Sequence, residues 1–420
     1  MGFASTYLEK RALFPELIKE APDNETGIIV VVPSYNEPGI TDLLDSLALC
    51  YIPGCKVEVI IVVNAPPGAG EESLTINRKS IQSIEFWKQS HRDSFFRLFV
   101  IDATSFALTG WGVGLARKTG MDEAIRRFNI SGRPEGVILN IDADCTVARN
   151  YLVSVHNELF IRKERTACSI YFEHPVSGTD FPEKVYESIT LYELHLRFYL
   201  QGLEYAGFPY VFHTVGSAFA VKALAYIKAG GMNRRMAGED FYFIQKLVPT
   251  GGYFNLNKTT VYPSPRSSFR VPFGTGATIT KLTGEGSENL LTYNMQAYNE
   301  LKTLFNMTDQ IFSCGTGNLS EIYSNLPEGL KLFISEEEWR EKMLEVKSNT
   351  SGPDSFKKRF FEWFNMFRIV KYLNRSHSVT FTKKPVVESA LELLNAEGKN
   401  MKSDDPKDIL FFYRKLEKEV

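Results

Sequence analysis

Two carboxylates, one residue apart, follow a run of aliphatic residues in the first half of the chain. Residues 137–141 read Val-Ile-Leu-Asn-Ile, and Asp142 and Asp144 come directly after them. Such a run predicts a strand that is buried on both faces. Ionised carboxylates are costly to bury, so we expect both aspartates where the strand leaves the core. There they suit a hard divalent cation, which takes oxygen ligands and can also hold a diphosphate. The alternative is an Asp-rich turn without metal.

The elements around this strand alternate in a way that would position these residues. We predict strands at 27–32, 57–63, 98–102 and 136–141, with helices at 41–47, 74–89 and 121–128 between them. This order indicates an α/β fold with a parallel sheet and right-handed crossovers. Ligands of such sheets gather at the carboxyl ends of the strands. The motif Gly-x-Gly-x-x-Gly is absent after the first strand, which argues against a dinucleotide dehydrogenase.

The rest of the chain divides into two parts. Up to about residue 280 we expect helices at 151–162, 184–205, 223–229 and 241–247, and strands at 167–172, 208–214, 217–221 and 259–262. Beyond it strand signals fade and amphipathic helices dominate. We therefore predict an N-terminal extension at 1–26, an α/β domain at 27–279 and a helical C-terminal region at 280–420.

Composition excludes several classes of protein. The chain has 420 residues, 44% of them hydrophobic and 23% charged, which is ordinary for a folded soluble protein. A net charge of −2 gives no polybasic surface for nucleic acid. Five cysteines without a Cys-x-x-Cys pair argue against a disulfide framework or a zinc site. We find neither a targeting segment nor an apolar run long enough to span a bilayer, so we expect a cytoplasmic enzyme.

Four stretches, taken together and in this order, resemble the family-2-type glycosyltransferases. They are Val-Pro-Ser-Tyr-Asn-Glu at 32–37, Gly-Val-Gly-Leu-Ala-Arg at 112–117, the Asp-Ala-Asp (DXD) motif at 142–144, and Gly-Ser-Ala-Phe-Ala at 216–220 with the later Gly-Gly-Met at 230–232 and Gly-Glu-Asp-Phe at 238–241. The resemblance implies the GT-A fold, a Rossmann-like, mostly parallel sheet with flanking helices. It also implies a hexosyltransferase that uses a UDP- or GDP-linked sugar and Mn²⁺ or Mg²⁺.

In that family the first two stretches bind the donor. Pro33, Tyr35 and Glu37 would line the nucleobase and ribose; the alternative is a plain strand-to-helix turn. Asn64 stands where the family usually has an acidic residue, which leaves the identity of the base open, since an amide can donate as well as accept. Arg117 would reach the diphosphate, because a guanidinium matches phosphate geometry. Alternatively it is an exposed residue in the first turn of a helix.

The other two stretches would carry the metal and the base. The resemblance assigns Asp144 to the cation, and Asp142 to the ribose or to metal-bound water. His213, at the end of the predicted strand 208–214, could add a ligand, or it could be a hydrogen-bonded structural histidine. Asp240, rather than Glu239, would remove the proton from the acceptor hydroxyl in a single, inverting displacement. Both acids also suit the first turn of a helix without any catalysis.

Two further segments bear on the acceptor. Arg266 and Arg270, in a loop that ends at Gly276, could close over the diphosphate or an acidic acceptor, or could form a solvated basic loop. The Gln-x-x-Arg-Trp motif of processive synthases is absent, which predicts non-processive transfer. The basic and aromatic segment 356–375 could lie on a membrane as a peripheral contact, although such a stripe also suits core packing.

The acceptor itself, a glycan, a lipid or a small molecule, stays open. The alternatives to an inverting transferase are a retaining enzyme of the mannosylglycerate-synthase type and a non-catalytic protein that binds sugar nucleotides. A nucleotidyltransferase would also have an α/β sheet and a metal. Such enzymes usually have a Gly-rich, basic loop directly after the first strand, and residues 33–38 do not form one.

Overall fold

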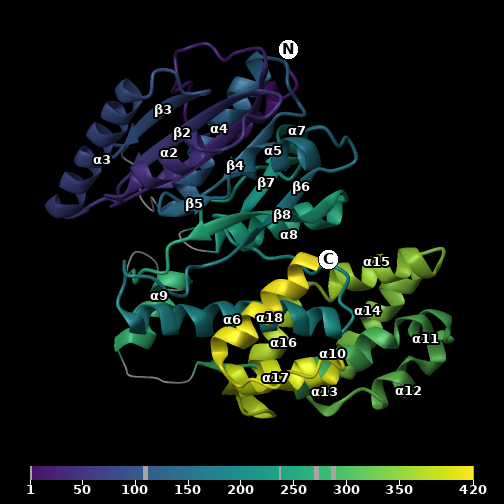
Figure 1. Cartoon of the computed structure of the whole chain (residues 1–420). Coiled ribbons are helices and arrows are strands. Elements are labelled where there is room, and N and C mark those ends of the chain that lie inside the picture. The colour runs from purple at the N-terminus through teal and green to yellow at the C-terminus, as the bar shows by residue number, and fades with distance from the viewer. Residues whose placement is uncertain (1, 107–111, 236–237, 269–273, 285–289, 420) are drawn as a thin grey trace. The chain divides into compact units, whose positions relative to one another are not determined.

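The computed structural model of the chain describes residues 2–106, 112–235, 238–268, 274–284 and 290–419 (Figure 1). The chain forms two compact units. The first consists of Met1–Phe181 and Phe212–Thr278, and the second consists of Pro182–Val211 and Ile279–Glu419. The ranges 27–279 and 280–420 stay a prediction of domain boundaries, and residues 182–211 cluster in space with the second unit.

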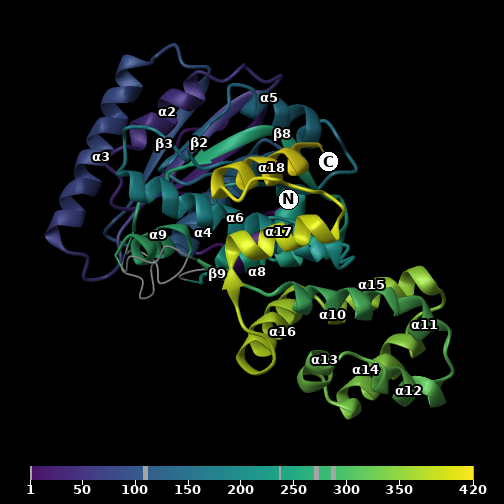
Figure 2. The same cartoon turned by 60° about the horizontal axis from the view of Figure 1, so that its bottom comes forward.

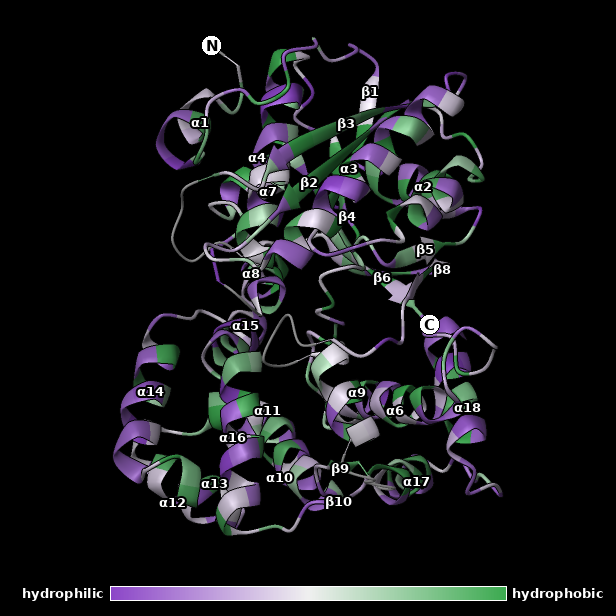
Figure 3. Cartoon of the chain, turned by 90° about the vertical axis from the view of Figure 1, so that its left-hand side faces the viewer, coloured by the Kyte–Doolittle hydropathy of each residue, from purple (hydrophilic) through white to green (hydrophobic). Residues whose placement is uncertain are grey.

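Four parallel strands form the first half of the central sheet. They run in the order β3 (Phe96–Ala103), β2 (Lys56–Asn64), β1 (Thr26–Ser34) and β4 (Val137–Asn140). All of β1 and β4 is buried, as their β-branched and aliphatic runs predict. Figure 3 shows β2 and β3 as hydrophobic strands. The strand order reverses between β1 and β4, which is where open α/β sheets bind ligands.

The second half of the sheet is mixed. The strand β7 (Phe219–Lys222) pairs antiparallel with both β4 and β6 (Ala167–Phe172), and β8 (Tyr253–Pro263) pairs parallel with β6. At the edge, β5 (Cys145–Val147) pairs antiparallel with β8. The eight strands therefore follow the order β3-β2-β1-β4-β7-β6-β8-β5. The predicted α/β class, with a mostly parallel sheet and a helical C-terminal region, is confirmed.

Helices cover both faces of the first four strands. The crossover helices α2 (Ile40–Ala48) and α3 (Glu71–Ser90) lie on one face, and α4 (Val113–Ile130) lies on the other (Figure 3). Gly120 allows α4 to approach the sheet closely, since a Cβ there would lie 2.5 Å from Val31 Cγ1. Further helices of this unit are α1 (Ser5–Arg11), α5 (Tyr151–Val155), which continues as a π-helical turn to Phe160, α7 (Ala223–Lys228) and α8 (Glu239–Leu247).

One predicted strand is absent, and one observed strand was not predicted. Residues 208–214 form no strand: Phe208 packs in the second unit against Phe305 and Phe361. The aromatic and β-branched residues there have high strand propensity, but no strand pairs with them. The strand β5 was not predicted, because three residues are too few to show the alternation of apolar and polar residues that is typical of a strand.

The second unit is helical and is built around α6 (Glu183–Tyr205). Figure 2 shows α17 (Val386–Ala396) and α18 (Pro406–Glu419) beside it. Its other elements are α9 (Thr275–Gly284, which begins at the end of the first unit), β9 (Leu291–Thr292), α10 (Met295–Asn306), α11 (Thr308–Ser313), α12 (Leu319–Ser324), α13 (Glu328–Phe333), α14 (Glu336–Ser348), α15 (Pro353–Trp363), α16 (Met366–Val379) and β10 (Lys384–Pro385).

A buried ionic network fastens α18 to α6. Glu193 and Arg197 lie one turn apart on α6 and both are 0% exposed. Arg414 of α18 donates to both carboxylate oxygens of Glu193, at 2.7 and 2.8 Å, and Arg197 pairs with Glu417. Each of these buried charges therefore has an opposite charge within hydrogen-bonding distance, which is the condition under which buried ions are tolerated.

The basic and aromatic segment is not one exposed helix. It divides into α15 and α16, and Asn365 caps α16 by accepting a hydrogen bond from the backbone N–H of Arg368 at 3.2 Å. Phe356, Phe360 and Phe364 are fully buried, so much of the aromatic stripe belongs to the core of the second unit. In the part of the chain that the structure describes, no helix is both long and apolar enough to cross a bilayer.

Candidate active site at the ends of β1 and β4

The chain segments that leave β1 and β4 lie next to each other, because these strands are paired with Val31 opposite Asn140. After β1 come Tyr35, which is half-buried, and Glu37, which is buried. Between them Asn36 has a φ of 57°, a left-handed conformation that asparagine tolerates better than most residues. After β4 the chain turns at Asp142, whose carbonyl accepts from the N–H of Cys145 at 3.1 Å. This brings together residues from the first and the third of the four predicted stretches.

A buried asparagine on α3 ties the loops after β1 and β2 together. The Asn77 side-chain oxygen accepts from the backbone N–H of Asn36 at 2.8 Å, and its amide nitrogen donates to the carbonyl oxygen of Asn64 at 2.9 Å. Ser80, one turn later, donates to the carbonyl oxygen of Glu37 at 2.6 Å. Pro33 lies within β1 opposite Val62, so it does not end the strand. Asn77 was not predicted from the sequence. An asparagine on the apolar side of a predicted helix could have indicated a buried side chain that forms hydrogen bonds with neighbouring loops.

Arg117 joins two of the predicted acidic residues. It lies in the first turns of α4, its side chain is 2% exposed, and it pairs with Asp142 at 2.5 Å and with Glu239 of α8. Gly216 packs against this guanidinium, since a Cβ there would lie 2.5 Å from Nη1. Burial alone would lower the pKa of Arg117, but the nearby carboxylates raise it above its ordinary value. Arg117 is therefore a permanently charged link between the β4 end and α8.

The acids that begin α8 sit in different surroundings. Gly238, the N-cap, has a φ of 69°, which glycine adopts without strain. Glu239 is buried, and burial raises its pKa to about 7 although Arg117 opposes the shift. Asp240 is half-buried and accepts backbone hydrogen bonds from Phe241, at 2.7 Å, and from Gly216. Burial also raises the pKa of Asp240, against the effects of Arg117 and these two bonds.

Arg266 bridges the β1 loop and the β4 turn. Its Nε donates to Asp144 Oδ2 at 3.0 Å, and its Nη2 pairs with Glu37. The Arg266 side chain is 26% exposed, in contrast to that of Arg117. Arg266 therefore lies beside Asp144, and its role in closing over the diphosphate or an acidic acceptor stays a prediction. Arg270, the other predicted arginine of this loop, lies outside the described residues.

The residues present satisfy part of what a divalent cation requires. Asp142 and Asp144 offer carboxylate oxygens, but each already pairs with an arginine. The described residues contain no group of three His, Cys, Asp or Glu side chains that could hold a metal. Mg²⁺ is usually bound by one or two carboxylates together with water and substrate phosphates, so Asp144 fits this role once Arg266 releases it.

His213 lies against the second half of the sheet. Its ring contacts that of Phe172 edge to face, with centroids 4.9 Å apart, and its carbonyl oxygen accepts from Ser169 Oγ at 2.5 Å. Its role as a metal ligand stays a prediction.

Comparison with known proteins gives distant structural likenesses. No protein-family model and no curated protein matches the sequence. TarS of S. aureus has 14% identity and a TM-score of 0.35, over 93% of this chain and 88% of that chain. The mannosyltransferase PcManGT of Pyrobaculum calidifontis, in complex with GDP-Man and Mn²⁺, has 14% identity and a TM-score of 0.35, over 99% and 92%.

A third likeness is to glucosyl-3-phosphoglycerate synthase of Mycobacterium tuberculosis, in complex with Mn²⁺, UDP and glucosyl-3-phosphoglycerate. It has 16% identity and a TM-score of 0.35, over 64% of this chain and 84% of that chain.

Proposed function

We propose that the chain is a metal-dependent, non-processive glycosyltransferase that moves a sugar from a UDP- or GDP-linked donor to an acceptor hydroxyl with inversion. The observation that carries the proposal is the Asp240 carboxylate, held at the start of α8 by two backbone N–H groups. It lies next to Glu239, which Arg117 links to Asp142 of the β4 turn. The resemblance stated from the sequence supports the same assignment.

In this proposal Asp240 is the catalytic base. The acceptor oxygen forms a bond to the anomeric carbon while the bond to the diphosphate oxygen breaks. The acceptor proton passes to Asp240, and the diphosphate leaves with the electron pair. A raised pKa makes Asp240 a better proton acceptor, and the positive field at the helix N-terminus helps to keep it ionised. Glu239, 3% exposed and paired with Arg117, is a positioning residue instead.

The donor would lie across the switch point between β1 and β4. Tyr35 would stack on the base, with Pro33, Glu37 and Asn64 around the nucleoside. Burial of Arg117 favours a role in orienting Asp142 and Glu239 over direct contact with the diphosphate. Arg266 is the less buried of the two arginines, and it would take the diphosphate in exchange for Asp144. Mn²⁺ or Mg²⁺, when bound, would neutralise charge on the leaving diphosphate.

The test is hydrolysis of a panel of UDP- and GDP-sugars with Mn²⁺. The variant Asp240→Asn should retain donor affinity, measured by calorimetry, and lose about 10²–10⁴-fold in rate, the usual contribution of a general base. Asp180→Asn is the matched control, because Asp180 is an exposed residue of the same unit. Failure of every nucleotide diphosphate to bind would refute the proposal, and normal turnover by Asp240→Asn would remove that residue from the mechanism.

The configuration of the product distinguishes inversion from retention. With an acceptor that is glycosylated, proton NMR of the new linkage should show the anomeric configuration opposite to that of the donor. The same configuration as the donor would favour a retaining mechanism on the same site.

A further inference from the structure

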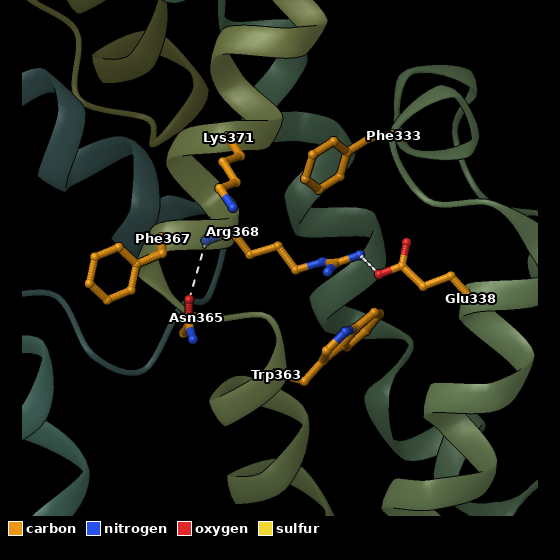
Figure 4. Close-up of a pocket in the computed structure, with 7 residues that line it drawn as sticks. All are labelled: Phe333, Glu338, Trp363, Asn365, Phe367, Arg368 and Lys371. Atoms are coloured by element: carbon orange, nitrogen blue, oxygen red, sulfur yellow. Dashed lines mark hydrogen bonds and ion pairs between the residues drawn. The ribbon is translucent and has the colours of Figure 1, made fainter.

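A pocket of about 390 Å³ opens within the helical second unit, between α13, α14, α15 and α16 (Figure 4). This volume is within the range of small-molecule sites, which typically combine aromatic walls with a few polar groups. The pocket has that composition: its walls include the aromatic residues Phe333, Trp363 and Phe367 and the charged residues Glu338, Arg368 and Lys371. None of them belongs to the candidate active site.

Arg368 is held in place inside this pocket, and some of its N–H donors have no acceptor among the described residues. Its guanidinium carbon lies 4.6 Å from the ring centroid of Trp363 and 5.3 Å from that of Phe333. Figure 4 shows the side chain extending between these two rings toward Glu338, with which it pairs. Its Nε is buried and has no hydrogen-bond acceptor among the described residues. The ring contacts and the Glu338 pair therefore fix a guanidinium that is only partly satisfied.

A second cation, Lys371, borders the pocket and has no partner among the described residues. Lys371 follows Arg368 by three residues, so the two share one side of α16. It is exposed, and no described residue makes an ion pair or hydrogen bond with its side chain. Arg375, one further turn along, is also exposed and unpaired among the described residues. The single carboxylate of the lining, Glu338, cannot balance these cations, so the pocket attracts anions.

The combination of groups narrows the class of ligand. Arginine binds carboxylates and phosphates through paired N–H donors, and the exposed lysine adds a charge-assisted bond. Trp363 and Phe333 are half-buried aromatic residues at the pocket wall, and their rings offer flat apolar surface to a ring-shaped ligand. A bare inorganic anion would use the cations but not these rings.

We propose that this pocket binds an anionic sugar, that is, a carbohydrate carrying a carboxylate or phosphate group. That the ligand carries an anionic group follows from Arg368 and Lys371 alone. That this group belongs to a sugar rests on the proposed function. In a transferase, such a site would retain an acidic glycan that serves as acceptor.

The test is calorimetric titration of the full chain at low salt with four probes. Trigalacturonate supplies carboxylates, glucose 6-phosphate supplies a phosphate, maltotriose is a neutral trisaccharide, and sodium phosphate is the anion without a sugar. We expect at least one acidic sugar to bind, and both maltotriose and phosphate to bind at least about tenfold more weakly, a difference of 1.4 kcal/mol.

Variants of an exposed residue connect binding to this pocket. Lys371→Glu should weaken binding of the acidic sugar by about tenfold or more, because it replaces attraction with repulsion. Lys371→Arg keeps the charge and should stay within about twofold of the parent. Lys402→Glu is the matched control, since Lys402 is exposed, lacks a partner among the described residues and makes the same change in net charge.

Three outcomes would overturn the proposal: no binding of either acidic sugar, equal binding of maltotriose or phosphate, or equal weakening by Lys371→Glu and Lys402→Glu. Failure of the proposed transferase function has a separate signature. In that case no nucleotide sugar is bound or hydrolysed, while the response of acidic-sugar binding to Lys371→Glu persists.

Discussion

Replacing Arg117 by methionine tests how far the buried ionic link organises the site. The substitution keeps most of the side-chain length and removes the charge. It leaves Glu239, which is 3% exposed, without its cation, whereas Asp142, 38% exposed, can turn to water. Breaking a buried pair on one side costs about 3–5 kcal/mol of unfolding free energy. Glu239 can escape part of that penalty by taking up a proton, so we expect about 3 kcal/mol at pH 8.

The loss should depend on pH with a defined sign. Burial raises the pKa of Glu239 in the folded protein to about 7, against an ordinary value of 4.5. The folded state therefore holds the proton more tightly than the unfolded state, and this group's contribution to stability increases as the pH falls from 7 to 4.5. Arg117 lowers the pKa of Glu239. Without Arg117, Glu239 in the folded protein therefore takes up its proton at a higher pH. The penalty of Arg117→Met should then be smaller at pH 5.5 than at pH 8, by about 1–2 kcal/mol at 1.36 kcal/mol per pKa unit.

The assay is urea unfolding followed by circular dichroism at both pH values. Arg92→Met is the matched control, because Arg92 is exposed and should change stability by less than about 0.5 kcal/mol. The double variant Arg117→Met with Glu239→Gln removes the unpaired charge and should recover about half of the loss at pH 8. The reasoning fails if Arg117→Met is as stable as Arg92→Met, or if its penalty is the same at both pH values.

Three further predictions concern the same site. Arg266→Ala removes the cation paired with Asp144, so Mn²⁺ alone should bind about tenfold more tightly. Electron paramagnetic resonance of the free ion measures this affinity, and an unchanged affinity would mean that Arg266 does not compete with the metal. Asn77→Ala removes two hydrogen bonds of a buried side chain and should lower the free energy of unfolding in urea by about 2 kcal/mol. A loss below about 0.5 kcal/mol would mean that Asn77 does not hold the loops after β1 and β2 together. Donor hydrolysis should fall as Asp240 takes up a proton, with an acid limb above the ordinary aspartate pKa of 3.8, since burial raises this pKa; a rate independent of pH down to 4 would exclude an ionised Asp240 from the reaction.

The first half of the sheet could be predicted because its residues leave few alternatives. Five consecutive aliphatic residues at 28–32 and the run at 59–63 suit strands buried on both faces, and both lie inside the observed β1 and β2. The strand predicted at 208–214 had similar residue types but no neighbouring strand. Propensity describes how well a segment suits a sheet, and only tertiary structure decides whether a sheet edge is available.

For the candidate site, the positions at strand ends could be predicted, but the pairings could not. Asp142 and Asp144 stand after a buried strand, so their place in the turn follows from the order of residues. The partners Arg117 and Arg266 come from elements far along the chain, and nothing in their own neighbourhood indicates which carboxylate each one meets. Long-range ion pairs depend on how the helices and loops are placed, which short-range periodicity does not encode.

The position of α6 has a consequence for how the chain can be made and divided. This helix is synthesised well before α10, α17 and α18, the helices that pack against it. During translation its apolar surface must therefore stay uncovered while the end of the first unit is still being added, a period in which chaperone binding or misassociation competes with folding. A fragment beginning at residue 280 would lack the helix at the centre of its unit, together with the Glu193 and Arg197 charges that Arg414 and Glu417 require. Limited proteolysis should accordingly yield nicked protein held together by α6 more readily than a separable C-terminal piece.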